Sequence, residues 1–448
     1  MSLVLKFIYR LYRVSSSLWH WAGRRFTRAG LCILGALFVG GASGLDVENT
    51  VAYQIFTLAL ALLIPAFVCS WFFRMRFSAM RQLPRFGTVG RPFVYSIVIK
   101  NLTDRTRRGL VLLENPADPR PTFQEWRSVQ MAEGHGVRSF RFSQRRRSSP
   151  FKVATMKEAE VPPLPPRGEA EARIELMPLR RGVLRLSSLT LARPDPLGLF
   201  RSFVEAPAPQ TVLILPKRYP LPPIALPGAM KYQEGGVALA ANVGRSEEFV
   251  ALREYRRGDP LRHIHWRSWA RIGKPIVKEF EDEFFVRHAL VLDTFTGDPH
   301  SELLEEAVSV AASFACTMLT QESLLDLLFV GSQSYCFTAG RGLGQADQML
   351  EILAAVRGCS DKSFPSLEHL VLDHVAVVSG CVCVLLAWDE ARRRLVEKLR
   401  LLGVPVLVLV IAPAGRTELD AGPLRDEPDR FQVLESGRIE QGLAELKG

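Results

Sequence analysis

Two histidines separated by one residue, His263 and His265, form the arrangement in this sequence that most resembles a pair of metal ligands. Imidazole nitrogens bind zinc, but a zinc site needs further ligands, usually cysteines or carboxylates at characteristic spacings. The segment around the two histidines is rich in arginine and supplies no such ligand at a suitable spacing. We therefore interpret both histidines as ordinary surface residues.

The cysteines also offer chemistry, because thiols form disulfides and bind metals. Their number is odd and no Cys-x-x-Cys motif occurs, which argues against a disulfide framework. The pattern favours buried thiols in a reducing compartment. The seven residues are Cys32, Cys69, Cys316, Cys336, Cys359, Cys381 and Cys383.

Motifs of the common catalytic sites do not occur in the sequence. It contains no Gly-x-Ser-x-Gly nucleophile elbow, no phosphate-binding loop, no dinucleotide-binding glycine fingerprint and no His-Glu-x-x-His motif. The residue pattern therefore assigns no reaction. We expect the protein to act by binding rather than as an enzyme.

The positive charge is concentrated at one end of the chain. The net charge is +11, and residues 1–85 hold ten lysines and arginines against two acidic residues. The rest of the chain is therefore close to neutral. This distribution weighs against nucleic acid as the partner and is typical of the flanks of membrane segments.

A basic leader at residues 1–28 precedes two apolar runs within residues 29–73. The runs, Ala29–Leu45 and Val51–Phe73, contain no charged side chain, and their lengths suit a bilayer, the first near the lower limit. A short acidic loop separates them, and cations flank both outer ends. By the positive-inside rule, this pattern predicts a transmembrane hairpin with both termini in the cytoplasm.

Two alternatives concern this region. A signal peptide cleaved near Ala42–Gly44 is a second interpretation of the first run, although the leader before it is unusually long for one. The leader mixes aromatic and cationic residues. It therefore either lies flat on the membrane surface or remains solvated.

Residues 86–215 predict a β-rich domain. The segments Phe93–Lys100 and Gly109–Glu114 are apolar and short, and residues 138–144 and 172–179 alternate as half-buried strands do. A proline-rich stretch at 161–168 separates strands. Short strands with frequent turn signals favour a small antiparallel sandwich.

Residues 216–285 form a connection, and the hydrophobic period changes in residues 286–448. Continuous apolar runs alternate there with amphipathic helical patterns, which predicts a parallel sheet covered on both faces, in a doubly wound α/β domain. The pair Asp298–Pro299 predicts the start of the first helix.

The connection carries the most specific pattern, between residues 244 and 283. Together with the Asp-Pro-x-Gly-Leu-Phe turn at Asp195–Phe200, it resembles the signature of the bacterial family called domain of unknown function 58. The resemblance covers roughly residues 86–411 and implies two N-terminal spans in a bacterial inner membrane. The signature residues expected to matter for function are Arg253, Tyr255, Gly258, Asp259, Arg262, Ile264, Trp266 and Arg271.

Two interpretations of this segment stay open. In the first, Arg253 and Arg271 pair with nearby carboxylates such as Glu254, and Ile264 and Trp266 pack on the sheet, so that the segment is a buried clasp between domains. In the second, the same residues form an exposed docking surface.

The C-terminal part is similar to a von Willebrand factor A domain, which implies a Mg²⁺ site at the carboxyl ends of the strands. The motif of that fold is Asp-x-Ser-x-Ser. Here Asp293 is kept, but Phe295 and Gly297 replace the serines, and Asp389 corresponds to the later aspartate. Mg²⁺ prefers oxygen ligands, so the two aspartates either bind Mg²⁺ weakly or cap the helices after their strands. Threonines that could supply oxygens instead are Thr294, Thr296 and Thr338.

The resemblance implies a membrane-anchored cytoplasmic interaction or adaptor protein. Its implied partner is a MoxR-type AAA+ ATPase, and its implied role is the assembly or maturation of a complex. Two alternatives remain. One is a metal-dependent hydrolase that uses Asp293 and Asp389. The other is a binder of anionic lipid or nucleic acid, against which the near-neutral charge beyond residue 85 weighs.

Overall fold

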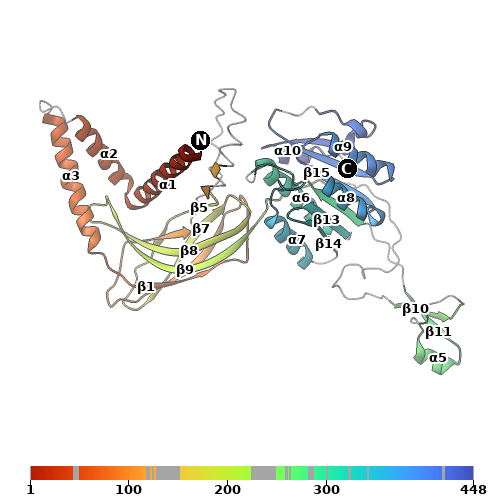
Figure 1. Ribbon diagram of the computed structural model, residues 1–448. Coiled ribbons are helices and arrows are strands. Elements are labelled where there is room, and N and C mark those ends of the chain that lie inside the picture. Colours follow the sequence, from red (N-terminus) through yellow and green to blue (C-terminus); the bar gives the residue numbers. More distant parts are fainter. Residues whose placement is uncertain are drawn as a thin grey trace. The chain divides into compact units, whose positions relative to one another are not determined.

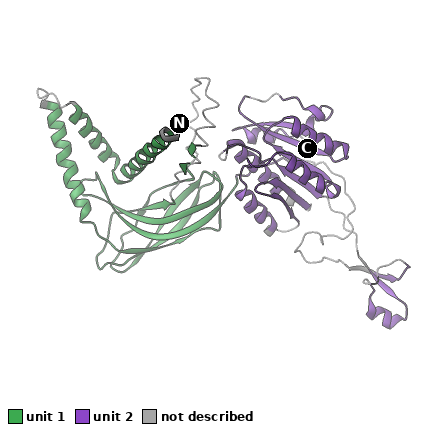
Figure 2. Ribbon diagram, in the orientation of Figure 1, with its two compact units in different colours: residues 1–216 green, residues 217–448 purple. Residues whose placement is uncertain are grey.

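The computed structural model divides into two compact units, residues 1–216 and 217–448 (Figure 2). Helices and strands are labelled in Figure 1. The chain is a multidomain α/β protein, as the sequence predicts. The structure describes residues 2–43, 50–117, 122–123, 126–127, 152–222, 249–257, 261, 264–280, 287–298, 301–320, 324–340, 343–415 and 419–446.

Three helices open the first unit: α1 (Ser2–Arg25), α2 (Arg28–Ser43) and α3 (Thr50–Trp71). Within α3, Val51–Trp71 is long and apolar enough to cross a membrane, with a mean hydropathy of 2.1. Helix α2 is apolar but has only 16 residues, about 24 Å of helix against a hydrocarbon core of about 30 Å. The described residues therefore contain one helix of spanning length, whereas the sequence predicted two spans.

Helices α2 and α3 pack side by side (Figure 1). Gly40 permits this contact, because a Cβ atom there would lie 3.2 Å from the carbonyl oxygen of Ala52 and the amide nitrogen of Phe56. Both helices also keep large apolar side chains exposed, including Phe38 at 71 % and Leu58 at 63 %. Apolar surface on all sides is typical of helices that face lipid.

The rest of the first unit is a β-sandwich whose two sheets share one core. One sheet has the order β1-β3-β7-β5 and the other β2-β9-β8-β4-β6. Alternate residues point inward, such as Ile97 and Ile99 on β3 and Leu189 and Leu191 on β8, all fully buried. The strands are β1 (Phe77–Gln82), β2 (Phe86–Thr88), β3 (Phe93–Asn101), β4 (Leu110–Pro116), β5 (Ala154–Met156), β6 (Ala159–Val161), β7 (Glu169–Pro178), β8 (Gly182–Pro194) and β9 (Arg201–Leu215).

The sandwich starts with β1, before residue 86, where the sequence analysis placed its beginning. The strand expected at residues 138–144 lies outside the described residues.

A buried ion pair joins the two sheets of the sandwich. Arg81 on β1 donates from Nη2 to Glu114 Oε1 on β4 at 2.6 Å and from Nε to Oε2 at 3.1 Å. The Tyr95 hydroxyl donates to Glu114 Oε2 at 2.6 Å, and Arg81 also donates to the carbonyl oxygens of Ser188 and Ala208. Burial, together with the charge of Glu114, raises the pKa of Tyr95 above its ordinary value. The network satisfies a carboxylate that water does not reach.

The second unit contains a six-stranded sheet with the order β14-β13-β12-β15-β16-β17. Neighbouring strands are parallel except for the antiparallel pair β13–β14. The central strands are buried along their whole length, as expected for a sheet covered on both faces. The strands are β12 (Arg287–Leu292), β13 (Leu324–Val330), β14 (Ser334–Ala339), β15 (Gly380–Leu385), β16 (Val406–Ala412) and β17 (Phe431–Glu435).

Helices connect these strands. α8 (Pro365–His374) and α9 (Glu390–Leu401) pack on one face of the sheet through residues such as Leu367 and Leu395. The remaining helices are α6 (Glu302–Thr320), α7 (Leu343–Ala355) and α10 (Ile439–Ala444).

The start of α6 differs from the prediction. The helix begins at Glu302, and Ser301 caps it by accepting a hydrogen bond from the amide of Leu304 at 3.4 Å. Asp298 instead belongs to the preceding turn, where its carbonyl oxygen accepts from the amide of Ser301 at 3.2 Å.

Candidate functional site

The carboxyl ends of β12 and β15 lie next to each other in the sheet. The two strands are parallel neighbours, and Leu292 pairs with Val384. The chain continues from β12 to β13 on one side and from β15 to β16 on the other, so the strand order reverses at this point. Open α/β sheets bind ligands at such a reversal, and Asp293 and Asp389 both follow these strand ends.

Asp293 is fully buried, and its carboxylate accepts hydrogen bonds from three groups. Oδ1 accepts a hydrogen bond from the amide of Phe295 at 3.0 Å. Oδ2 accepts from the amide of Leu386 at 3.0 Å and from Arg392 Nε at 2.7 Å. Asp293 thus joins the ends of β12 and β15. It does not cap a helix, although helix capping was one of the two roles expected for it.

Asp389 is the N-cap of α9, and here the capping interpretation agrees with the structure. Its Oδ1 accepts from the amide of Arg392 at 3.1 Å. Its Oδ2 pairs with Arg392 Nη1 at 2.5 Å. Its side chain remains 53 % exposed, so Asp389 forms the open side of the cluster.

Arg392 therefore lies between the two aspartates, with its side chain only 8 % exposed. Burial lowers the pKa of Arg392, but the charges and hydrogen bonds of Asp293 and Asp389 outweigh burial and raise it above its ordinary value. The guanidinium carbon also lies 4.7 Å from the centre of the Phe364 ring, which in turn packs edge-on against Phe295 at 5.8 Å. The guanidinium is thus fixed by two carboxylates and an aromatic face.

These residues do not fit a resident Mg²⁺ ion. A hard cation needs several free oxygen ligands, whereas the cationic position between Asp293 and Asp389 is taken by Arg392. The neighbouring Thr294 hydroxyl donates to the carbonyl oxygen of Val330 at 2.5 Å. Across the part of the chain that the structure describes, no group of three or more His, Cys, Asp or Glu side chains is placed to hold a metal ion.

The other threonines expected as substitute ligands are also engaged. Thr296 Oγ1 accepts a hydrogen bond from the amide of Asp298 at 3.2 Å. Thr338 donates to Asp326 Oδ1 at 2.6 Å, beside the buried pair of Arg287 with Asp326. Arg287 opens β12, so this second cluster belongs to the opposite end of that strand from Asp293.

The signature segment forms a small module of its own within the second unit. Strands β10 (Phe249–Glu254) and β11 (Ile276–Phe280) pair antiparallel, and the short helix α5 (Trp266–Ile272) lies between them in the chain. Three expected site residues, Gly258, Asp259 and Arg262, lie outside the described residues.

The described signature residues differ in exposure. Ile264 is 7 % exposed and pairs with Val277 of β11, so it belongs to the small core of the module. Trp266 was expected to pack on the sheet, but it is 64 % exposed and stacks on Trp269 with ring centres 5.2 Å apart. The reason is that α5 has only seven residues and buries none of them.

The polar contacts of the module also differ from the expected pairs. Glu254 pairs with Lys274 at 3.1 Å, and Arg253 Nη1 donates to the carbonyl oxygen of Glu254 at 3.3 Å. The amide of Tyr255 donates to the carbonyl oxygen of Pro275 at 2.9 Å, and Arg271 is exposed at the end of α5.

The Asp195–Phe200 turn, which joins β8 to β9, contacts the helices of the first unit. Asp195 Oδ1 accepts from the amides of Leu199 and Phe200, each at 2.7 Å, which fixes the turn. Thr27, between α1 and α2, donates from its hydroxyl to Gly198 O at 2.6 Å and from its amide to Leu199 O at 3.1 Å. A Cβ atom at Gly30 would collide with the Leu199 carbonyl oxygen, so glycine is required there.

Sequence reasoning missed two of these features. Arg392 follows Asp389 by three residues, and this spacing after an N-cap was an available signal. The docking of the turn on Thr27 had no signal in the sequence, because the two segments are far apart in the chain.

The fold and the site thus define a protein with apolar N-terminal helices, a β-sandwich and a mixed six-stranded α/β sheet. Residues 251–413 match the family described as "Protein of unknown function DUF58". The match runs from β10 to the end of β16, and over these residues the predicted resemblance is confirmed.

Two further comparisons give a relative and a solved structure. "Uncharacterized protein YeaD" of Bacillus subtilis (strain 168) is 27 % identical over 184 residues, which are 40 % of this chain and 44 % of that protein. The chain thus matches less than half the length of this relative. The crystal structure of a GH20 exo-β-N-acetylglucosaminidase from Vibrio harveyi has 8 % identity over 76 % of this chain and 57 % of that chain, but a TM-score of 0.12 supports no argument about fold.

Proposed function

We propose that the protein is a membrane-anchored cytoplasmic interaction protein and that the module of β10, α5 and β11 docks its partner. The observation that carries this proposal is the 64 % exposure of Trp266, stacked on Trp269 at the surface of the module. Burial of an exposed aromatic side chain by a partner is favourable, because it removes apolar surface from water. Tryptophan and arginine also dominate the binding energy of protein interfaces.

The charge of the module indicates the kind of partner surface. Residues 249–280 contain eight lysines and arginines against three acidic residues. Exposed apolar side chains, Leu252 at 41 % and Ile272 at 59 %, accompany these cations. A complementary surface is acidic, with an apolar depression for Trp266.

The proposed partner is a MoxR-type AAA+ ATPase, and the proposed role is assembly or maturation of a complex. The family resemblance supports the partner, and the acidic surface just described is the chemistry by which it would be recognised. The strand order of the second unit supports a von Willebrand factor A-like domain, now with Arg392 in the cation position. We retain two spans, α2 and α3, with both termini in the cytoplasm of a bacterium, because cations flank both outer ends of the pair.

The test is a pull-down of the full chain, with a C-terminal tag, from gently solubilised membranes, followed by mass spectrometry. We expect an AAA+ ATPase with the wild-type chain, and a more than tenfold lower recovery with Trp266→Ala, since a central aromatic residue contributes about 2 kcal/mol or more. A chelator should leave recovery unchanged, because a guanidinium supplies the cation at the sheet edge.

Leu401→Ala is the matched control, because Leu401 is also a large exposed apolar residue, at 82 %, but lies on α9. It should recover the ATPase as the wild type does. Equal recovery with Trp266→Ala, or recovery of no ATPase by any variant, would contradict the proposal.

A further inference from the structure

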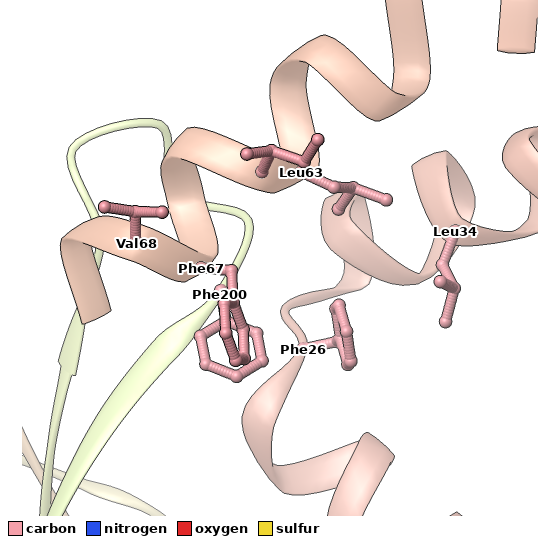
Figure 3. Close-up of a pocket in the computed structure, with 7 residues that line it drawn as sticks. Phe26, Leu34, Leu63, Phe67, Val68 and Phe200 are labelled. Carbon is pink, nitrogen blue, oxygen red and sulfur yellow. The ribbon is translucent and has the colours of Figure 1, made fainter. Parts of the chain in front are cut away.

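A cavity lies where the helices of the first unit meet the β8–β9 turn (Figure 3). Its volume is about 280 Å³. Four residues of α3 line it, together with Phe26, Leu34 and Phe200 from other segments of the first unit. The Phe200 ring packs edge-on against Phe26 at 5.0 Å and against Phe67 at 5.7 Å. The complete lining is Phe26, Leu34, Leu63, Ile64, Phe67, Val68 and Phe200.

The lining is suited to an apolar guest. All seven side chains are hydrocarbon, and an apolar cavity of this kind binds apolar molecules in preference to water. The volume exceeds the roughly 150 Å³ of an apolar cavity that binds benzene, so it has room for part of an acyl chain. Ile64, Phe67 and Val68 remain 53 %, 50 % and 47 % exposed, so the cavity is open on the α3 side.

Two arginines next to the cavity have unsatisfied hydrogen-bond donors. Arg24 and Arg25 end α1, directly before the lining residue Phe26. The guanidinium carbon of Arg25 lies 5.8 Å from the centre of the Phe200 ring and 4.7 Å from that of Phe203. Arg24 Nη2 and Arg25 Nε are buried, and neither has a hydrogen-bond partner among the described residues.

The two arginines differ in their electrostatic surroundings. Burial lowers the pKa of both, but for Arg24 the charges of Glu205 and Glu158 partly offset this effect. For Arg25 the pKa is lowered by burial. Arg25 is only partly buried, but its buried Nε has no hydrogen-bond partner among the described residues. An unpaired buried donor is costly, so Arg25 is the better position for an external anion.

We propose that the cavity and Arg25 together bind an anionic phospholipid, with part of an acyl chain in the cavity and the phosphate on the Arg25 guanidinium. The position agrees with a lipid, because Phe67 and Val68 lie in the last turns of α3. A membrane crossed by α3 has its headgroups near the end of that helix. The proposal rests on the membrane attachment proposed above.

The turn at Asp195–Phe200 gives this site a rigid wall. Asp195 holds the turn through the amides of Leu199 and Phe200, and Thr27 ties the turn to the start of α2. The site therefore exists before the ligand arrives, which lowers the entropy cost of binding.

The test uses the full chain reconstituted into vesicles of phosphatidylcholine and phosphatidylglycerol in equal parts. Electron paramagnetic resonance of spin-labelled lipids measures the association of each lipid with the protein. We expect phosphatidylglycerol to be preferred over phosphatidylcholine by about fivefold, the usual contribution of one arginine at an anionic surface. Arg25→Gln should abolish that preference.

Three variants distinguish the proposed site from general attraction. Arg13→Gln removes the same charge from an exposed position of the same helix and should keep the preference. Val68→Trp, and independently Leu34→Trp from α2, fill the cavity and should remove the tightly held lipid. Equal effects of Arg13→Gln and Arg25→Gln would overturn the proposal, as would full retention of lipid by both filled variants.

Soluble glycerol phosphate distinguishes the lipid from its headgroup alone. It should not displace the labelled lipid, and displacement would overturn the role of the acyl chain. The outcome for membrane attachment is separate. A chain that does not float with the vesicles contradicts attachment itself, whereas a chain that floats without lipid preference contradicts only the lipid site.

Discussion

Each unit of the protein buries arginine–carboxylate pairs, and two of them, Arg81–Glu114 and Arg392–Asp293, occur in different surroundings. Arg81 and Glu114 lie inside the sandwich, with no exposed side-chain surface on either partner. Arg392 and Asp293 lie at the carboxyl ends of the central strands β12 and β15, where Asp389 on the open side is 53 % exposed. The first pair joins two sheets, and the second pair closes the place where an α/β sheet binds ligands.

The comparison shows that the role of a buried ion pair depends on its place in the fold. In the sandwich, Tyr95 and two backbone carbonyl groups complete the network, so it holds strands together. At the sheet edge, the arginine occupies the position between two carboxylates that a cation would take. We infer that the Arg392 guanidinium takes the place of a bound cation at this site.

Arg81→Met should have the largest effect. It leaves Glu114 buried without its cation, and breaking a buried pair from one side costs about 3–5 kcal/mol. Hydrogen exchange should show faster opening of the strands of the sandwich and no change in the second unit. Addition of Mg²⁺ should not restore stability, because both side chains of the pair are closed to solvent. Unchanged protection of β1 and β4 would contradict the structural role of this pair.

Arg392→Met should destabilise the second unit by about 3 kcal/mol, because Asp293 then stays buried without its cation. The comparison predicts one difference from Arg81→Met. Millimolar Mg²⁺ should raise the melting temperature of Arg392→Met, since the two carboxylates remain together at an open edge, but should not raise that of the wild type. The measurement is thermal unfolding of the full chain in detergent, with and without Mg²⁺.

Asp389→Asn is the control for that experiment. It keeps the N-cap oxygen and removes only the half-exposed charge, so its cost should be about 1 kcal/mol or less. A Mg²⁺ response equal in the wild type and in Arg392→Met would mean that the guanidinium does not replace a cation.

His288→Leu should have the smallest effect, visible only in acid. His288 on β12 is 4 % exposed, and burial lowers its pKa below the ordinary value near 6.5. The unfolded chain then binds a proton at His288 more readily than the folded chain. The folded state is therefore not penalised by His288 above about pH 6.5, and the free energy of unfolding falls as the pH decreases, by at most about 1.4 kcal/mol per pH unit.

The melting temperature, measured from pH 7 to pH 5, should therefore fall less steeply for His288→Leu than for the wild type. Parallel curves would show that His288 is not the group responsible. This prediction sharpens the comparison with the two ion pairs. Their buried groups have partners, whereas Nδ1 of His288 is a buried polar atom that lacks a hydrogen-bond partner among the described residues.

Sequence patterns predicted much of the second unit and less of the first. Continuous apolar strands alternating with helices indicated a covered parallel sheet, because strands buried on both faces carry no alternation. Of the two predicted spans, the one at Val51–Phe73 corresponds to a helix of spanning length, whereas the one at Ala29–Leu45 corresponds to α2, which has only 16 residues. The helix start at Asp298 was wrong because Ser301 supplies the cap instead.

The sequence by itself determined the apolar character of α3, the period of the strands and helices, and the family match of residues 251–413. These are local properties, because each depends on neighbours within one element. Only the tertiary structure decided that Arg392 neutralises Asp293, 99 residues away, and that Thr27 holds the turn at Leu199, 172 residues away. Such contacts depend on the register of β12 beside β15 and on the docking of a turn against helices, which no local pattern fixes.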